Sequence, residues 1–187
     1  MECKKMAHAI GLIAWGSLVL SFNLNFGSLN LIPSWVGYLL MGKAIKELKG
    51  VSPAMGLLGP LCILLAALEL WFWALTLIGI NSQHYLLQLL SLLLAVAALY
   101  FHFQLLTNLV EALGRAGETW RKELLNLRTV RTVLAAVMAL PVLWKEHFAV
   151  TVILAIAGVL VGISISAVLF WIRNALFKSL CPAEEKE

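Results

Sequence analysis

The fold is determined by residues 55–80, which read MGLLGPLCILLAALELWFWALTLIGI. This stretch contains a single charged side chain, Glu69. An apolar segment of about 20 residues is long enough to cross a bilayer core of about 30 Å. Residues 85–110 contain no Lys, Arg, Asp or Glu, residues 149–172 contain no charge at all, and residues 7–23 form a fourth apolar segment. The sequence therefore predicts an all-α, polytopic membrane protein.

Two shorter apolar runs, at residues 31–42 and 132–144, each lie beside or contain a proline, Pro33 or Pro141. Runs of this length can be re-entrant or interfacial rather than spanning. If both span, thirteen of the fourteen Lys and Arg residues fall on one side of the membrane, and only Lys145 falls on the other. Because basic residues concentrate on the cytoplasmic side, this distribution favours six transmembrane helices with both termini in the cytoplasm. The predicted spans are residues 7–23, 32–48, 55–80, 85–110, 132–144 and 149–172, within a single domain covering residues 1–187.

The composition agrees with this assignment. The chain has 187 residues, of which 61% are hydrophobic and 13% charged, whereas about a quarter of the residues of a soluble domain are charged. The net charge of +4 follows from the topology and from attraction to anionic lipid headgroups, so it does not call for nucleic-acid binding. The predicted location is the plasma (inner) membrane.

The sequence does not support an enzymatic function. The chain contains no Asp, which excludes an aspartyl dyad, and it has no His-Glu-x-x-His zinc motif. Cys3, Cys62 and Cys181 do not have the spacing of a metal site. We therefore expect a protein that is not an enzyme, with no catalytic residues, no cofactor and no metal.

Residues 117–131 are the main segment outside the predicted spans. Trp120, Leu124 and Leu127 recur at helical spacing, with basic residues off that stripe. This pattern is typical of an amphipathic helix on the inner leaflet, and a helix that docks a partner is the alternative. The two halves of the chain each run long, short, long, which is compatible with a 3+3 inverted repeat like those of transporters.

Glu69 is the leading candidate for a functional residue. It lies near the middle of its span, where a charged carboxylate costs about 3 kcal/mol on insertion scales and should face the interior of the bundle. Trp73 lies one turn further along the same face. Gln88 and His102 belong to a similar stripe in residues 85–110, and Asn25 and Asn30 lie in the first outer loop. These six residues form the predicted substrate-binding set, with interhelical hydrogen bonding as the structural alternative for Gln88 and His102.

Small residues recur every fourth position in the last span, at Gly158, Gly162 and Ser166. Such spacing lets two helix backbones approach closely. The spacing is compatible with helix packing within one molecule and with a homodimer interface.

The run NLIPSWVGYLL at residues 30–40, followed by Lys46-Glu47-Leu48, resembles a pattern in small, uncharacterised multi-span bacterial membrane proteins. The chain is also similar, in length and number of spans, to the S-components of energy-coupling-factor vitamin transporters. That likeness implies a substrate held beneath the loop after the first span. Two features depart from that family: Ala7-x-x-x-Gly11 only approximates its Ala-x-x-x-Ala docking signature, and Lys43 stands where its riboflavin type often has Gly-Pro.

Two functions remain open from the sequence. The first is binding or translocation of a small solute through a site near Glu69, under the first outer loop. The second is a non-enzymatic membrane interaction or assembly factor, which would use the basic inner helix and the Gly158/Gly162/Ser166 seam to contact a partner membrane protein or a second copy.

The topology predicts which sites a membrane-impermeant thiol reagent reaches in intact cells. In a background without native cysteines, Ser82→Cys and Glu146→Cys should be labelled, and Gly117→Cys should be protected, because the first two lie in predicted outer loops. Labelling at Gly117→Cys, or protection of both outer positions, would contradict the six-span topology.

Overall fold

The computed structural model describes residues 2–22, 25–26, 29–30, 33–50, 52–78, 85–114, 118–139 and 148–180. These parts of the chain form six helices and one short hairpin. The helices are α1 (Glu2–Ser21), α2 (Ser34–Leu48), α3 (Pro53–Leu77), α4 (Tyr85–Leu113), α5 (Glu118–Met138) and α7 (Phe148–Leu180). The hairpin pairs β1 (Asn25–Phe26) with β2 (Leu29–Asn30) in antiparallel register. The prediction of an all-helical fold is confirmed, with this hairpin as a small addition.

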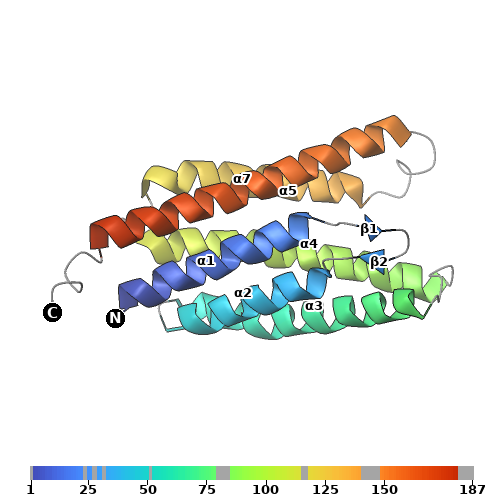
Figure 1. Ribbon diagram of the computed structural model, residues 1–187, viewed down its shortest axis with the longest axis horizontal. Helices are drawn as coiled ribbons and strands as arrows, with labels where there is room; N and C mark the ends of the chain where they lie inside the picture. The colour runs from blue at the N-terminus through green and yellow to red at the C-terminus, as the bar shows by residue number, and fades with distance from the viewer. Residues whose placement is uncertain are drawn as a thin grey trace.

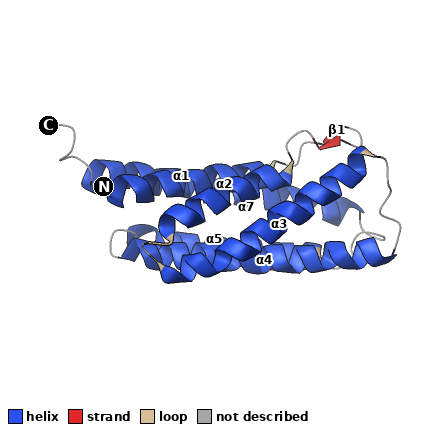
Figure 2. Cartoon of the chain, turned by 90° about the horizontal axis from the view of Figure 1, so that it is seen from below, coloured by secondary structure: helices blue, strands red, loops and turns tan. Residues whose placement is uncertain are grey.

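The helices form a closed ring in sequence order. Each helix packs against the next along the chain, and α7 packs back against α1. Successive helices run in opposite directions, so the start of α1 and the end of α7 lie at one end of the bundle and the hairpin lies at the other (Figure 1). In the perpendicular view α3 crosses obliquely, linking the layer of α1, α2 and α7 to the layer of α4 and α5 (Figure 2).

Three of the described helical segments are long and apolar enough to cross a membrane: Pro53–Leu77, Tyr85–Leu113 and Ala149–Lys178. Their outer faces carry large apolar side chains that no protein covers, such as Leu57 at 81% and Leu86 at 76% exposure. Exposed apolar surface on this scale is compatible with contact to lipid. Helix α2, with 15 residues, is only about 22 Å long. Six membrane crossings therefore remain a prediction.

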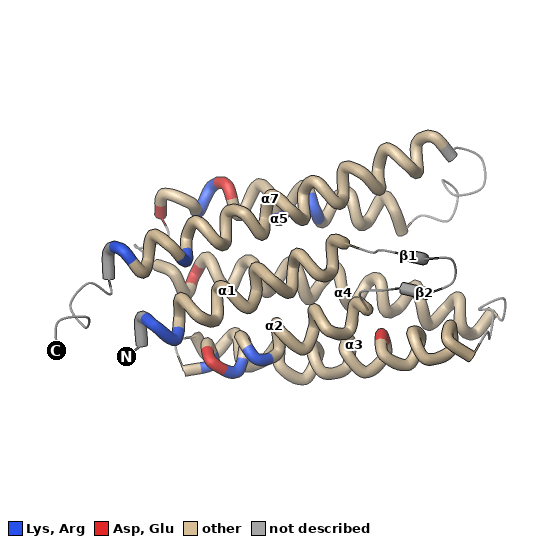
Figure 3. Tube along the Cα trace, in the orientation of Figure 1, with Lys and Arg blue, Asp and Glu red and all other residues tan. Residues whose placement is uncertain are grey.

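Basic residues mark one end of the bundle. Most of the described Lys and Arg positions gather where α1 begins and α7 ends, while the opposite half of the bundle is nearly free of them (Figure 3). This end holds Lys4 and Lys5 at the start of α1 and Lys178 near the end of α7. The structure thus brings together the basic clusters that the sequence places on one side of the membrane.

Helix α5 joins two segments that the sequence analysis separated at residue 131. The predicted amphipathic helix and the start of the predicted fifth span form one continuous helix, Glu118–Met138. No Gly or Pro interrupts it, and the hydroxyl groups of Thr129 and Thr132 donate to carbonyls one turn back, on Leu125 and Arg128. Residues 140–147, which include Pro141, lie outside the described residues. Arg131 is therefore inside a helix, about 20 Å from its first residue.

The small residues of the last span pack within the molecule. A side chain at Gly162 would run into the side chain of Ser21 on α1, and one at Gly158 would reach Leu134 of α5 at 3.6 Å. Ser166 is buried, and its hydroxyl donates to the carbonyl of Gly162. Gly162 and Ser166 thus belong to the α1–α7 contact rather than to a free surface.

Helices α1 and α2 cross at two facing glycines. A Cβ built on Gly16 would lie 2.8 Å from the carbonyl oxygen of Gly37, and a Cβ on Gly37 would lie 2.9 Å from that of Gly16. The obstacle on each side is backbone, which cannot rotate away. Only glycine at both positions allows this close approach.

We expect Gly37→Ala to lower the midpoint of thermal unfolding of the purified protein, because the added methyl group forces α1 and α2 apart, at a cost of about 1–3 kcal/mol. Gly158→Ala on α7 is the matched control, since a Cβ there would make only an ordinary contact, 3.6 Å from a side-chain carbon of Leu134. The control should be neutral or slightly stabilising, because alanine favours helix over glycine. Equal midpoints for the two variants would contradict the close α1–α2 crossing.

Candidate functional site

Glu69 lies on the face of α3 that turns toward the bundle. Cys62 and Ala66, on the same face, are buried, and Glu69 itself is half-buried. The thiol of Cys62 donates to the backbone carbonyl of Tyr38 on α2 at 3.1 Å. This contact fixes the position of α2 against the face that carries Glu69. Trp73 continues that face one turn further toward the hairpin end.

Tyr38 lies at the junction of α2, α3 and α4. Its side chain is only 3% exposed. Its ring lies 5.8 Å from the ring of Phe101 and 5.9 Å from that of His102, both on α4. Its backbone carbonyl accepts the hydrogen bond from Cys62 of α3. Tyr38 therefore joins α2 to both α3 and α4.

Arg131 and His102 line a cavity of about 130 Å³ between α4 and α5. The remaining lining residues are Ala95, Ala98, Leu99, Thr132 and Ala135. The two basic side chains also interact electrostatically. Such a volume exceeds what one water molecule needs and is small beside the pockets of drug-sized ligands, so it suits a few waters or part of a small solute.

Arg128, one turn before Arg131, has a different environment. Its Nη1 donates to the hydroxyl of Thr107 at 2.8 Å, and its guanidinium lies 4.1 Å from the centre of the Phe103 ring. These contacts tie α5 to α4. Arg128 thus has a structural role, whereas Arg131 lines the cavity.

We call Tyr38, Glu69, His102 and Arg131 the polar hub. Each comes from a different helix. The rings of Tyr38 and His102 lie 5.9 Å apart, and His102 and Arg131 line the same cavity. Glu69 lies on the face of α3 whose Cys62 bonds to the backbone of Tyr38. Ionisable groups are rare within membrane-embedded helices and usually serve function. The hub can donate hydrogen bonds from a guanidinium, an imidazole and a phenol, and it can accept them at a carboxylate.

Two tryptophans lie between the hub and the hairpin. The rings of Trp35 on α2 and Trp73 on α3 are 6.4 Å apart in an edge-to-face arrangement. The indole nitrogen of Trp35 is buried and has no hydrogen-bond partner among the described residues. Strand β2 contacts α3 nearby. An indole donor is therefore available on the hairpin side of the hub.

The predicted substrate-binding residues fall into three groups. Glu69 and Trp73 share a face of α3, and Tyr38, which is bonded to Cys62 on that face, lies against His102 of α4. Gln88 is exposed near the start of α4. Asn25 and Asn30 face one another in the hairpin register, but their side chains lie outside what the structure describes.

Sequence reasoning missed Tyr38 and Arg131. Tyr38 falls inside the predicted span at residues 32–48, and Arg131 falls at the end of the predicted amphipathic helix at residues 117–131, because the fifth span is predicted to begin at residue 132. The uninterrupted helical sequence from Glu118 to Met138 is the signal that would have placed Arg131 inside the bundle.

Comparison with known proteins finds no match to the chain among protein-family models, curated proteins or solved structures. Within the described residues, no group of three or more His, Cys, Asp or Glu side chains is arranged to hold a metal ion.

Two substitutions at Tyr38 distinguish the contribution of its ring to stability from that of its hydroxyl. Tyr38→Ala removes the buried ring that packs on Phe101 and His102, so we expect a loss of about 3–5 kcal/mol in the free energy of unfolding. Tyr38→Phe keeps the ring and should leave that free energy nearly unchanged. Thermal unfolding of the purified variants measures both, and a Tyr38→Ala protein as stable as the wild type would mean that this side chain is not buried at the junction.

Proposed function

We propose that the protein is a multi-pass plasma membrane protein that binds or translocates a small polar solute at the polar hub. The observation that supports this proposal is that four helices of an otherwise apolar bundle each place a polar side chain in one region: Tyr38 lies against His102, His102 shares a cavity with Arg131, and Glu69 lies on the face of α3 that is bonded to the backbone of Tyr38. Packing alone does not require these groups, because small and apolar residues suffice to join helices in a membrane. Ionisable groups in a membrane-embedded bundle cost free energy, and those that are present usually serve a function.

The chemistry of the hub favours a solute with an anionic group. Arg131 offers a planar set of donors that matches a carboxylate or a phosphate, and His102 shares its cavity. Glu69 can accept hydrogen bonds from a hydroxyl or ammonium group at the other end of the solute. The cavity of about 130 Å³ favours a solute of a few heavy atoms on the Arg131 side.

Access is proposed from the hairpin end. The basic residues gather at the opposite end (Figure 3), which the positive-inside bias assigns to the cytoplasm. The hairpin then lies on the outer side, with Trp35 and Trp73 between it and the hub. The direction of access agrees with a site under the first outer loop.

The assembly-factor alternative loses one of its two surfaces. Gly162 and Ser166 are occupied by contacts within the bundle, so the seam is not free to bind a partner. Arg121 and Lys122 on α5 remain exposed. The polar hub has no role in that alternative, which is why we favour the solute-binding function.

Native mass spectrometry of the purified protein should reveal a bound small solute, which can then be titrated calorimetrically. Arg131→Gln should weaken its binding about tenfold or more, since a hydrogen bond to a charged group contributes about 1.5–3 kcal/mol. Glu69→Gln, which is nearly isosteric, should preserve folding and also weaken binding.

The matched controls are Arg121→Gln and Glu123→Gln, which remove the same charges from exposed positions of α5. Both controls should bind like the wild type. Wild-type affinity in Arg131→Gln and Glu69→Gln would remove the hub from the site and overturn the proposed function.

A further inference from the structure

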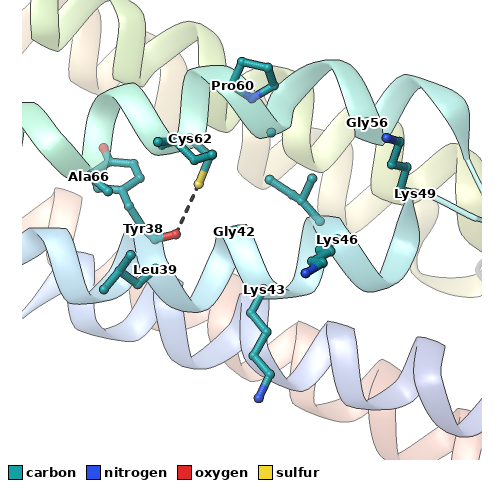
Figure 4. Close-up of a pocket in the computed structure, with 13 residues that line it drawn as sticks. Tyr38, Leu39, Gly42, Lys43, Lys46, Lys49, Gly56, Pro60, Cys62 and Ala66 are labelled. Carbon is teal, nitrogen blue, oxygen red and sulfur yellow. Dashed lines mark hydrogen bonds between the residues drawn. The ribbon is translucent and has the colours of Figure 1, made fainter.

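A second cavity, of about 570 Å³, lies between α2 and α3. It is a groove rather than an enclosed space, because Leu39 and Ile63 on its rims are 56% and 71% exposed. Figure 4 shows its walls, with Tyr38 and Ala66 toward one end and Lys49 and Gly56 toward the other. It opens on the side of the bundle and does not reach the α4–α5 cavity, since the two share no lining residue.

Three lysines of α2 stand at the basic end of this groove. Lys43, Lys46 and Lys49 are exposed, and no carboxylate lines the groove. Glu47, the only acid of α2, pairs instead with His8 of α1 at 2.9 Å. In Figure 4 the Lys49 side chain reaches toward Gly56 across the groove, while Lys43 extends from the opposite side of α2. The end of the groove is thus a net positive site with no acid of its own.

The remainder of the groove is apolar and narrow. Small residues on both helices keep it open: Gly42 on α2, and Gly59 with its neighbour Pro60 on α3. A Cβ at Gly59 would meet no atom within 4 Å. From Tyr38 to Lys49 the groove follows α2 for about 16 Å. This shape and surface match an alkyl chain lying along the two helices.

We infer that this groove binds one anionic phospholipid from the leaflet at the basic end of the bundle. The lipid phosphate lies against Lys46 and Lys49, with Lys43 at the rim, and one acyl chain lies along the groove past Gly59. The lysines and the apolar surface belong to one continuous groove. The lysines attract an anionic headgroup, and an acyl chain covers the apolar surface. A phosphate compound from water would leave that surface bare.

The lysine arm of the test uses detergent-purified, delipidated protein and native mass spectrometry with added phosphatidylglycerol or phosphatidylcholine. The wild type should bind one phosphatidylglycerol in preference to phosphatidylcholine. In the double variant Lys46→Gln/Lys49→Gln this preference should fall roughly 25-fold, which is about fivefold for each lysine near the headgroup. Arg121→Gln/Lys122→Gln removes the same charge from α5 and should keep the preference.

The groove arm tests the acyl-chain site separately. Gly59→Leu fills the open space and should abolish binding of the single tight phosphatidylglycerol. Gly59→Ala places the same Cβ before Pro60, with the same effect on the backbone, but leaves the groove open and should keep that binding. Ala67→Leu, at an exposed position of α3 outside the groove, should bind like the wild type. Binding of inorganic phosphate with the same lysine dependence and no effect of Gly59→Leu would overturn the lipid assignment.

Two further results would also overturn the inference. One is an equal loss of preference in the lysine variant and in the α5 control, which would show a diffuse charge effect. The other is a protein subunit that co-purifies with the wild type, is released by Gly59→Leu and excludes the lipid, which would make the groove a protein interface.

Discussion

The cost of placing polar side chains among apolar helices is the constraint on which the bundle depends. An ionisable group in a lipid-facing position is unfavourable, so such groups must face protein and find partners there. Glu69 and Arg131 come from helices α3 and α5, which are not neighbours in the ring. Tyr38 of α2 joins the two sides, because its backbone is bonded to α3 and its ring lies against His102, which shares a cavity with Arg131. Closing the ring therefore brings these polar groups into one region of the bundle.

Helix α2 is the element through which the parts of the molecule are connected. Gly37 lets its backbone touch α1, Tyr38 turns inward to the hub, and Gly42 and Lys46 line the groove beside α3. Helix α2 has only 15 residues, so nearly every one of its turns takes part in one of these contacts. A shift of α2 along α1 would disturb the hub and the groove together, which makes the glycine crossing important for both sites.

The sequence was informative where the physical signal is local. Long apolar runs predicted α3, α4 and α7 close to their observed bounds, and the lone carboxylate Glu69 pointed to the interior because lipid penalises charge. Small residues in α7 indicated close packing, and the structure identifies Ser21 of α1 as the partner of Gly162. The basic residues were predicted to share one side, and the described ones gather mainly at one end of the bundle (Figure 3).

What the sequence left open depends on long-range contacts. Arg131 has the same local signature as a residue at a membrane interface, and only the continuity of α5 places it beside His102. Gln88 fits the same stripe as His102, but the half of α4 that begins at Tyr85 is poorly covered by other helices, so Gln88 is exposed. In the sequence, the groove lysines indicate only the orientation of the chain in the membrane. Their place in a groove depends on α3, which forms the facing wall.

The contact between Tyr38 and His102 offers the most direct test of the hub. With ring-labelled tyrosine and histidine, solid-state NMR of the protein in lipid bilayers can detect rings that lie close together. The account predicts a Tyr–His cross-peak, from rings 5.9 Å apart, that disappears in both Tyr38→Phe and His102→Gln. A spectrum of the wild type without a cross-peak that depends on both residues would contradict the meeting of α2 and α4 on which the polar hub rests.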